Sequence, residues 1–393
     1  MKKYGLKDGF KELIKIIVEQ EKLKDGMLNV FFAGGSASGK STGAENIMKR
    51  LRELGYDVAL ISADTYSRGG RYAKENGISF DDPEYIDVEA ARRDIENLEN
   101  RKSIFEKEFN FDDEPFHSTD EKISPPKILL VEGLFVLRDE LRDLADIKVF
   151  FNIGFHGWML RRAFRDAVRT GMMPADIIGY CINYVEPKYQ QWIHSTIAYA
   201  DIVIENEYDP AIESKNSGRF EMQQKYSSSL DEAELIHNLL KLGADRLASV
   251  YQADIYFNPY DRNLGLTDEI VRIRKEGKRT VWTYKGPKTD GRRHKYEFEI
   301  PEDMVEAFLQ IYGKIVKNID KTRTIFLLGS IVVTVDSVIG IESGIKRDLG
   351  TFIEFRINTK TIGREAFLKT IGGLAKNIGL EAASVVDASY FEM

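Results

Sequence analysis

The chain contains very little cysteine and few histidines. Of its 393 residues, one is Cys and 5 are His. Cys181 is the single cysteine, so it cannot form a disulfide within the chain, and a reducing, cytoplasmic location is expected. The histidines lie at positions 117, 156, 194, 237 and 294 and do not show the spacing of zinc ligands, which argues against a zinc site.

Long uninterrupted apolar runs are also missing. The longest, "TIFLLGSIVVTVDSVIGI", is divided by Gly329 and Ser330 and carries Asp336, which favours two strands joined by a turn over a membrane span. The first 20 residues have helical spacing without a signal-peptide core, so we expect an N-terminal helix. The formal net charge of −7 predicts neither nucleic acid nor membrane as a partner. Whether the chain forms a homo-oligomer is left open.

The first half of the chain alternates strand and helix patterns. Short apolar segments such as "LNVFFAGG", "DVALISAD", "KILLVEGLFVL" and "IKVFFNI" predict buried strands. The amphipathic segments "STGAENIMKRLRELG" and "GWMLRRAFRDAVRTG" predict helices between them. This alternation is typical of an α/β fold, in which helices flank a parallel sheet on both faces.

The pattern changes after residues 207–218, a polar segment rich in turn formers that we expect to be a linker. We therefore predict one domain over 1–206 and a second over 219–393. In the second, Ser229 and Glu232 are spaced as a helix capping box. Eight further segments of alternating polarity, from "RFEMQQKYS" to "TFIEFRI", predict an antiparallel barrel wide enough for a ligand.

A phosphate-binding loop stands out in the first domain. The stretch "GGSASGKST" satisfies G-x-x-x-x-G-K-[ST], with a strand before it and a helix after it. Backbone N–H groups of such a loop bind phosphate oxygens, while Lys40 reaches the β- and γ-phosphates and Ser41 holds Mg²⁺. The predicted nucleotide-binding residues are Gly34, Gly35, Ser36, Ala37, Ser38, Gly39, Lys40, Ser41 and Thr42.

Acidic and basic residues follow in places that suit phosphoryl transfer. Asp64 ends the next strand, where a carboxylate can take the proton of an acceptor hydroxyl, although it could instead cap its own turn. Glu132 ends another strand and is a candidate for the Mg²⁺ shell. Arginines 161, 162, 165 and 169 recur along one helix, which is either a solvated face or a lid that neutralises charge.

These motifs resemble the uridine kinase and phosphoribulokinase family. The segments "GGSASGKST", "ISADTYS", "DDPEYID", "VEGLFVL" and "RRAFRDAVR" occur in the order typical of that family, over about residues 27–206. The resemblance implies ATP as donor, bound with Mg²⁺ by Lys40 and Ser41, and Asp64 as the base. It also implies an arginine lid of Arg162, Arg165 and Arg169.

The acceptor region departs from the family. Uridine kinases carry Tyr-Asp-Phe followed closely by His and Arg, a segment that reads the nucleoside. Here the region is "FNFDDEPFHST", with Asn110 in place of the Asp, His117 displaced, and Thr119 in place of the Arg. Uridine itself is therefore not predicted as the acceptor; a small hydroxyl-bearing metabolite, nucleoside- or sugar-like, is.

Like charges two residues apart recur along the predicted strands of the second domain. They include Arg272 with Arg274, Glu297 with Glu299, and Lys321 with Arg323. Such pairs share one side of a strand and are costly to bury unless they face a ligand or each other. Either these sides face solvent, or they line a lumen that binds phosphate with basic groups and metal with carboxylates.

The second domain resembles the CYTH, or triphosphate tunnel, superfamily, which includes class IV adenylate cyclases and triphosphatases. The likeness rests on "QADIYF", "VRIRK", "TYKGPK", "YEFEI", "DKTR" and "ASYFEM" and runs from about residue 219 to the end. It implies that a triphosphate is bound by Lys225, Arg272, Arg274, Lys285, Lys321 and Arg323. It also implies that Mg²⁺ or Mn²⁺ is bound by Glu221, Glu297, Glu299, Asp336 and Glu354.

Two substitutions in the tunnel motifs change the charge. The family opens with Glu-x-Glu-x-Lys, but the middle acid here is Gln223, and the usual closing Glu-x-Glu ends in Arg356. One lost and one reversed charge make the region three units more positive. Because unit charges 4 Å apart interact by roughly 4 kcal/mol at an effective dielectric of 20, an arginine beside a metal is unfavourable. We predict a tunnel that binds phosphate with weakened or rearranged metal catalysis.

The sequence thus predicts a P-loop kinase domain fused to a triphosphate-binding barrel, with ATP-dependent phosphoryl transfer as the leading function. A fusion in this order also resembles plant triphosphate tunnel proteins, which supports the alternative of a hydrolase acting on pyrophosphate, triphosphate or nucleotide phosphoanhydrides. A third alternative is a barrel that senses a polyphosphate or nucleotide and regulates the kinase half.

Overall fold

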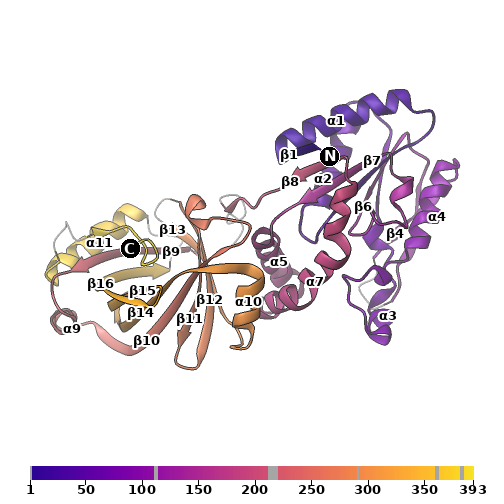
Figure 1. Cartoon of the computed structure of the whole chain (residues 1–393). Helices are drawn as coiled ribbons and strands as arrows, with labels where there is room; N and C mark the ends of the chain where they lie inside the picture. The colour runs from indigo at the N-terminus through magenta and orange to yellow at the C-terminus, as the bar shows by residue number, and fades with distance from the viewer. Residues whose placement is uncertain (1, 110–113, 211–219, 290–291, 359–362, 381–384) are drawn as a thin grey trace. The chain divides into compact units, whose positions relative to one another are not determined.

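The computed structural model describes residues 2–109, 114–210, 220–289, 292–358, 363–380 and 385–393. The chain divides into two compact units, Met1–Tyr208 and Asp209–Met393, each with its own sheet (Figure 1). The expected linker lies largely outside the described residues. None of the helices in the described part of the chain combines the length and apolar character needed to cross a membrane.

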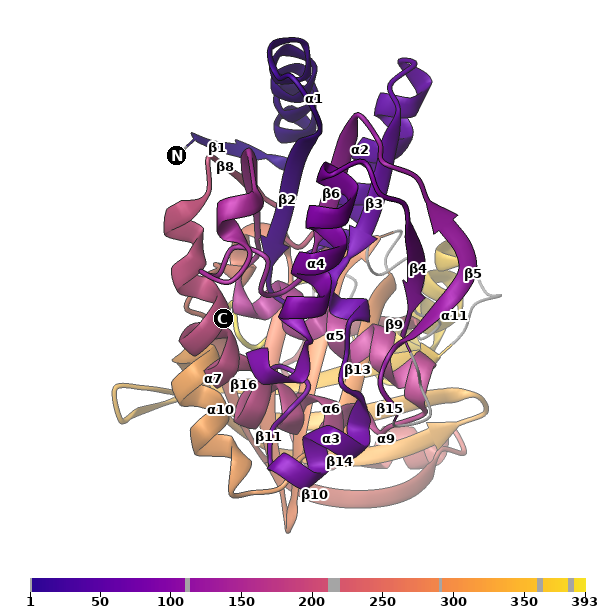
Figure 2. The same ribbon diagram turned by 90° about the vertical axis from the view of Figure 1, so that its right-hand side faces the viewer.

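The N-terminal unit is built on a six-stranded sheet in which every pairing is parallel (Figure 2). In spatial order its strands are β1 (Lys2–Gly5), β8 (Ile202–Glu205), β7 (Ile147–Asn152), β2 (Leu28–Gly34), β6 (Ile128–Glu132) and β3 (Val58–Ser62). Its helices are α1 (Leu6–Leu23), α2 (Lys40–Glu53), α3 (Gly69–Asn76), α4 (Val88–Glu99), α5 (Phe155–Thr170), α6 (Pro174–Tyr180) and α7 (Glu186–Lys188). This is the predicted α/β architecture.

Both faces of this sheet are covered, as the uninterrupted apolar strands predicted. On β2, Val30 and Phe32 pack into a core with residues of α1 and α2, whereas Phe31 packs on the opposite face with residues of α4. Successive side chains of a strand point to opposite faces, so a strand that is apolar throughout must be covered on both. Burial on both faces holds the carboxyl ends of β2, β6 and β3 in a fixed arrangement.

The N-terminus and one hairpin were not predicted. The N-terminal helix begins at Leu6, and residues Lys2–Gly5 form β1, an edge strand parallel to β8. Four residues are too few to show the alternation of a strand. The helical pattern that follows them therefore led to the prediction of a helix from the start of the chain. Strands β4 (Ile104–Glu108) and β5 (His117–Ile123) form a separate two-stranded ribbon, which Figure 2 shows to one side of the sheet.

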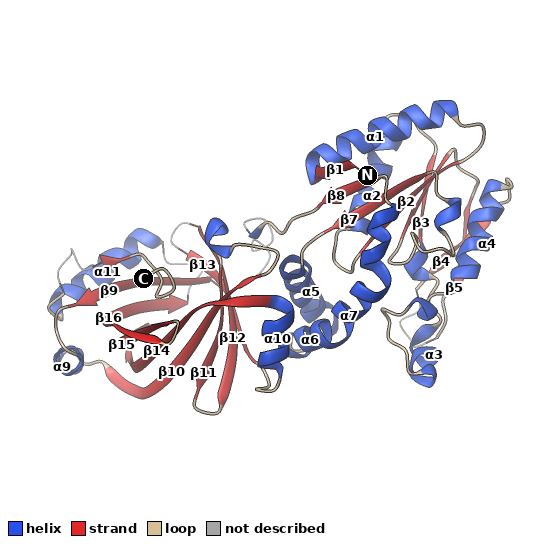
Figure 3. Ribbon diagram, in the orientation of Figure 1, coloured by secondary structure: helices blue, strands red, loops and turns tan. Residues whose placement is uncertain are grey.

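The C-terminal unit contains a closed antiparallel barrel of eight strands, as predicted (Figure 3). Around the barrel the order is β13 (Arg292–Glu299), β12 (Arg279–Thr289), β11 (Ile270–Glu276), β10 (Asp245–Pro259), β14 (Gly313–Leu328), β15 (Ile331–Glu342), β16 (Ile345–Asn358) and β9 (Phe220–Ser228). Pairing of β13 with β9 closes it, and the short β17 (Val385–Val386) pairs with β9. The helices are α9 (Glu232–Lys241), α10 (Met304–Tyr312) and α11 (Arg364–Asn377).

The long apolar run forms β14 and β15, which are joined through Gly329 and Ser330 as predicted. The expected capping box is wrong by two residues. Asp231 caps α9 by accepting from the Glu234 amide at 2.8 Å, and the Glu234 carboxylate accepts from the Asp231 amide at 3.3 Å. Both pairs have the same spacing, and the aspartate is the residue that directly precedes the helix.

Candidate functional site

The glycine-rich loop connects β2 to α2 in the N-terminal unit. Gly39 has a left-handed φ of +91°, and a Cβ there would lie 2.4 Å from Asn206 Nδ2. Asn206 Nδ2 in turn donates to the Ser38 carbonyl oxygen at 2.7 Å. Position 39 therefore requires glycine, and Asn206, at the end of β8, holds the loop immediately before the N-terminus of α2.

Charged side chains meet beside this loop, at the carboxyl ends of three neighbouring strands. Lys40 Nζ lies 3.3 Å from Asp64 Oδ2 and 3.9 Å from Glu132 Oε2. Ser41 Oγ donates to Glu132 Oε2 at 2.9 Å, and Ser62 Oγ donates to Glu132 Oε1 at 2.5 Å. The structure thus brings together the four residues that the sequence picked out from separate segments: Lys40, Ser41, Asp64 and Glu132.

Burial and charge set the protonation of this cluster. Burial raises the pKa of Glu132, and the ammonium of Lys40 opposes that shift. Burial alone would lower the pKa of Lys40, but the carboxylates of Asp64 and Glu132 outweigh it and raise the pKa. Asp64 Oδ1 accepts from the Leu134 amide at 2.9 Å, a residue 70 positions away. This contact positions the carboxylate relative to the loop that follows β6.

The donor set here fits Mg²⁺. Magnesium in nucleotide sites is usually bound by one or two carboxylates together with substrate phosphates and several waters. The Ser41 hydroxyl and the Glu132 carboxylate supply such a partial shell, with Asp64 nearby. In the described part of the chain, no three His, Cys, Asp or Glu side chains form a complete metal-binding group, which a magnesium ion shared with nucleotide does not need.

Two of the predicted lid arginines are tied to acids. Arg162 lies 3.8 Å from Asp81 Oδ1 and donates through Nε to Asp166 Oδ2 at 3.2 Å. Arg165 Nε donates to Asp166 Oδ1 at 2.7 Å. The positive charge of Arg165 acts to lower the pKa of Lys40, against the effect of the carboxylates. Arg165 therefore lies close enough to influence the loop site.

The other two arginines of α5 differ in position. Arg161 Nη1 lies 3.5 Å from the Ala37 carbonyl oxygen of the phosphate loop. Arg169 is exposed in the last turn of the helix. Helical spacing placed the four arginines correctly along α5, but it did not reveal that Arg162 and Arg165 both donate to Asp166.

Asp81 was missed as a site residue. Its side chain is buried, and Tyr180 Oη donates to its Oδ2 at 3.4 Å. Burial raises the pKa of Asp81, the charge of Arg162 lowers it, and the charges of Asp64 and Lys40 also act on it. Asp81 therefore belongs to the loop site. Its position in "DDPEYID" was visible, but its burial beside residues of α5 and α6 depends on tertiary structure.

The acceptor region is described in part. Asn110 lies outside the described residues. His117 begins β5 with its Nε2 3.5 Å from Glu108 Oε2, and its side chain is exposed. Thr119 Oγ1 accepts from the Glu121 amide at 3.2 Å within the same ribbon.

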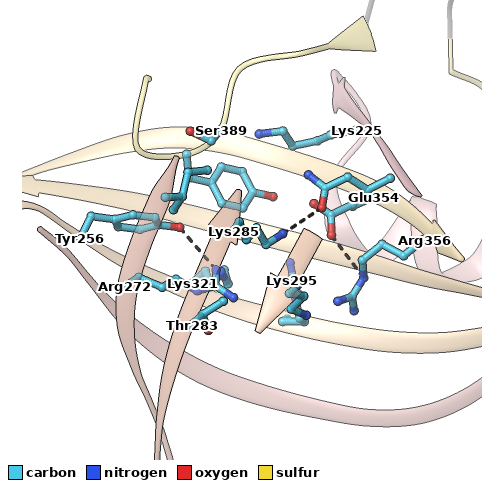
Figure 4. Close-up of a pocket in the computed structure, with 14 residues that line it drawn as sticks. Lys225, Tyr256, Arg272, Thr283, Lys285, Lys295, Lys321, Glu354, Arg356 and Ser389 are labelled. Atoms are coloured by element: carbon cyan, nitrogen blue, oxygen red, sulfur yellow. Dashed lines mark hydrogen bonds and ion pairs between the residues drawn. The ribbon is translucent and has the colours of Figure 1, made fainter. Parts of the chain in front are cut away.

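The barrel of the C-terminal unit encloses a second concentration of charge (Figure 4). Among the residues that the structure describes, seven basic side chains line a cavity there, together with one acidic side chain, Glu354. The basic residues come from six strands and are Lys225, Arg272, Lys285, Lys295, Lys321, Arg323 and Arg356. Tyr256, Thr283, Ser389 and Tyr390 add hydroxyl groups.

Most of the predicted tunnel residues face this cavity or bond to residues that do. Five of the six predicted cations line it, and the sixth, Arg274, binds the buried Asp254 through Nε at 2.6 Å. Glu299 is different: it is exposed at the end of β13, where it accepts from Arg279 Nε at 3.1 Å. Strand alternation placed it on the correct side of β13 but could not show that the strand ends at the barrel mouth.

Asp254 was missed, as was Lys295. Asp254 is 1% exposed, and its carboxylate accepts from Arg274 at 2.6 and 2.8 Å and from Lys321 at 2.7 Å. Arg272 Nη1 lies 3.3 Å from the same group. The register pairs Asp254 with Arg274 across β10 and β11. A buried cluster of cations needs an acidic counter-ion. This general requirement was the only indication of Asp254 that the sequence offered.

The remaining tunnel acids are paired as well. Glu221 lies 3.0 Å from Lys285, 3.2 Å from Lys295 and 3.9 Å from Arg356. Glu354 lies 3.3 Å from Arg356. The other two are Asp336, held by two hydrogen bonds from Arg323, and Glu297, 3.0 Å from Lys295.

This arrangement does not fit a divalent cation. Metal-binding carboxylates must turn free oxygen atoms to the ion, whereas Glu221 and Asp336 accept hydrogen bonds from lysine or arginine, and Glu297 and Glu354 form ion pairs with Lys295 and Arg356. Burial alone would raise the pKa of Glu297, but Lys295 and Arg272 lower it to about 2. Burial lowers the pKa of Lys225 and of Lys285 to about 8. The cavity is therefore short of negative charge, which suits an anionic ligand.

Comparison with known proteins agrees with this division. The model of the phosphoribulokinase/uridine kinase family matches residues 30–213, and that of the CYTH domain matches residues 220–390. The chain is 32% identical over 179 residues to a uridine kinase of Macrococcus caseolyticus, covering 44% of this chain and 84% of that protein.

Two further relatives align over longer stretches. Uridine-cytidine kinase C of Dictyostelium discoideum is 25% identical over 384 residues, covering 95% of this chain and 79% of that protein. The inorganic pyrophosphatase TTM2 of Arabidopsis thaliana is 30% identical over 205 residues, covering 51% of this chain and 29% of that protein. The chain belongs to the phosphoribulokinase/uridine kinase family and carries a CYTH domain after its kinase-like domain.

Proposed function

We propose that the N-terminal domain transfers the γ-phosphoryl group of ATP to a hydroxyl of a small nucleoside- or sugar-like metabolite. The observation that carries this proposal is the meeting of Lys40, Asp64 and Glu132 beside the phosphate loop, with Lys40 Nζ 3.3 Å from Asp64. We assign this activity to residues 1–206 and expect the protein to act in the cytoplasm.

The loop and Lys40 bind the phosphates. Backbone N–H groups of residues 34–42 and the N-terminus of α2 face negative charge, and Lys40 Nζ binds a β- or γ-phosphate oxygen. Ser41 and Glu132 would hold Mg²⁺ together with the nucleotide, and the ion would supply positive charge to the phosphate oxygens. When Lys40 turns to the nucleotide, it leaves Asp64, its partner in the structure.

Asp64 then acts on the acceptor. Its free carboxylate oxygen takes the proton of the acceptor hydroxyl as the new oxygen–phosphorus bond forms and the bond to ADP breaks. Asp81 lies beside it as a buried carboxylate and binds a second hydroxyl of the acceptor. Arg162, Arg165 and Arg169 on α5 neutralise the charge of the transferring group.

A coupled assay of ADP release tests the proposal. With a panel of nucleosides, sugars and sugar phosphates, ADP release should require one of the acceptors, and Lys40→Ala should abolish it. Arg272→Ala, in the barrel, should leave this turnover unchanged. ADP release at the same rate without any acceptor would contradict the proposal.

A second candidate function is hydrolysis of pyrophosphate, triphosphate or a nucleotide phosphoanhydride in the barrel. The basic cavity supports it, because seven lysine and arginine side chains can bind the charged substrate. The similarity to a protein named as an inorganic pyrophosphatase also favours it. Release of phosphate from the anhydride alone, lost in Arg272→Ala and kept in Lys40→Ala, would identify this activity. Binding without turnover would instead favour a barrel that senses the ligand.

A further inference from the structure

The charges that meet inside the barrel do not balance. Eight basic side chains line the cavity or bond to the acids around it: Lys225, Arg272, Arg274, Lys285, Lys295, Lys321, Arg323 and Arg356. Five acidic side chains bond to them: Glu221, Asp254, Glu297, Asp336 and Glu354. Basic groups outnumber acidic groups by three within this set.

Arg356 is central to that excess. Its guanidinium lies 3.3 Å from Glu354 (Figure 4). It also lies 3.9 Å from Glu221, so it is close to two carboxylates. It lines the main cavity and also an adjoining one that includes Glu221 and Glu297. The guanidinium of Arg356 therefore lies beside the carboxylates of both Glu354 and Glu221.

We propose that the barrel binds a linear chain of three or more phosphates in its metal-free form, with Arg356 supplying the positive charge that a divalent ion would otherwise bring. The inference rests on the proposed binding of phosphate in the barrel. It adds that divalent cations are not part of the bound complex and that they compete with the barrel for the ligand.

The spread of the basic groups selects a chain of phosphates over a single one. The seven basic residues that line the cavity come from β9, β11, β12, β13, β14 and β16. One phosphate reaches only a few of these strands, whereas a chain presents oxygen atoms to several walls at once. Guanidinium and ammonium groups both donate to phosphate oxygens, and arginine does so through two parallel N–H groups.

The same lining disfavours the metal complex of the ligand. Magnesium removes two negative charges from a polyphosphate and brings a shell of waters with it. Both effects weaken attraction to a wall that already holds excess positive charge and whose acids are bonded to lysine and arginine. The metal-free ligand keeps its full charge and meets the arginine and lysine donors directly.

Calorimetric titration of the full-length Lys40→Ala protein with sodium tripolyphosphate tests the inference, because that variant silences the phosphate loop. Binding should be as tight in EDTA as in its absence, and millimolar Mg²⁺ should weaken it by about tenfold through competition for the ligand. Binding only with Mg²⁺, or phosphate release that requires Mg²⁺ or Mn²⁺, would overturn the inference while leaving anion binding in place. No heat in either condition would refute phosphate binding in the barrel itself.

Substitutions at Arg356 sharpen the result. Arg356→Gln should weaken binding in EDTA by about 30-fold or more, the usual effect of removing one charged partner from a desolvated pair. Arg356→Glu should weaken it further and make the remaining binding dependent on Mg²⁺. Arg347→Gln, an exposed change on the same strand, is the matched control and should bind like the parent. Equal affinity of Arg356→Gln and the parent would show that Arg356 has no such role.

Discussion

Replacing Asp254 by asparagine should destabilise the barrel more than any surface substitution. Asp254 is 1% exposed and accepts three hydrogen bonds of 2.6 to 2.8 Å from Arg274 and Lys321. Asparagine keeps the shape but removes the charge, which leaves buried cations without their counter-ion. Removing one partner of a buried ion pair costs about 3–5 kcal/mol, a large part of the stability of a domain.

Hydrogen exchange followed by mass spectrometry can localise this effect to the barrel. Peptides from β10, β11 and β14 should exchange about 100- to 5,000-fold faster in Asp254→Asn, since each 1.4 kcal/mol corresponds to a factor of ten. Peptides of the N-terminal unit should be unchanged. Asp245→Asn, an exposed change at the start of the same strand, is the matched control and should fall within about 0.5 kcal/mol of the parent.

Repeating the exchange experiment with tripolyphosphate distinguishes a counter-ion role of Asp254 from a packing role. If Asp254 acts as a counter-ion, tripolyphosphate should slow exchange more in Asp254→Asn than in the parent, because the ligand supplies the missing negative charge. If the side chain only fills space, the ligand should protect both proteins equally. A loss of less than about 1 kcal/mol in the variant, near the ordinary effect of a point substitution, would refute the counter-ion role.

Three further predictions concern the two phosphate sites. Asp64→Asn should lower kcat for phosphoryl transfer by about 10²- to 10⁴-fold. Nucleotide affinity should change little, because asparagine can still accept from the Leu134 amide. An unchanged kcat would exclude Asp64 as the base. Gly39→Ala should weaken ATP binding in calorimetry, because the new Cβ would lie 2.4 Å from Asn206. The control is Gly55→Ala, where φ is similar at +88° but no atom lies within 4 Å of the new Cβ. Equal effects of the two substitutions on ATP binding would contradict the role of Gly39. Tripolyphosphate affinity should fall as the pH rises through about 8, because burial lowers the pKa of Lys225 and Lys285 to about 8 and deprotonation removes their charge. A decline that begins only near 10.5 would show that the pKa of these groups is not perturbed.

Motifs whose partners are close in sequence could be predicted fully. The phosphate loop follows from a contiguous spacing, and the alternation in "VRIRK" correctly placed Arg272 and Arg274 on one side of β11. Residues whose role depends on distant strands could not. Asp254 meets Lys321 only because β10 pairs with β14, and Asp81 meets Arg162 only through the packing of α5. The alternation of residues within one segment gives neither the pairing of β10 with β14 nor the packing of α5.

The end of an element was equally hard to predict. Glu299 follows the same alternation as Glu297, yet only Glu297 bonds to the cations that line the cavity. The pattern gives the side of the strand but not how far the barrel encloses it. The substitution at Arg356 was visible in the sequence, and Glu354 lies two residues away on the same strand, whereas the contact of Arg356 with Glu221 depends on the pairing of β16 with β9.

The two phosphate sites differ in the charge of the side chains that surround the bound phosphates. Beside the loop, Lys40 faces the carboxylates of Asp64 and Glu132. Carboxylates in such sites bind Mg²⁺ together with substrate phosphates, so we expect a triphosphate to bind there with a dication. In the barrel, eight basic groups line the cavity or pair with five acidic ones, so we expect a triphosphate to need no dication. One sample of the protein should therefore respond to EDTA in two directions: phosphoryl transfer should stop, while tripolyphosphate should remain bound. A chelator that abolished both would mean that the positive excess of the barrel does not substitute for a metal.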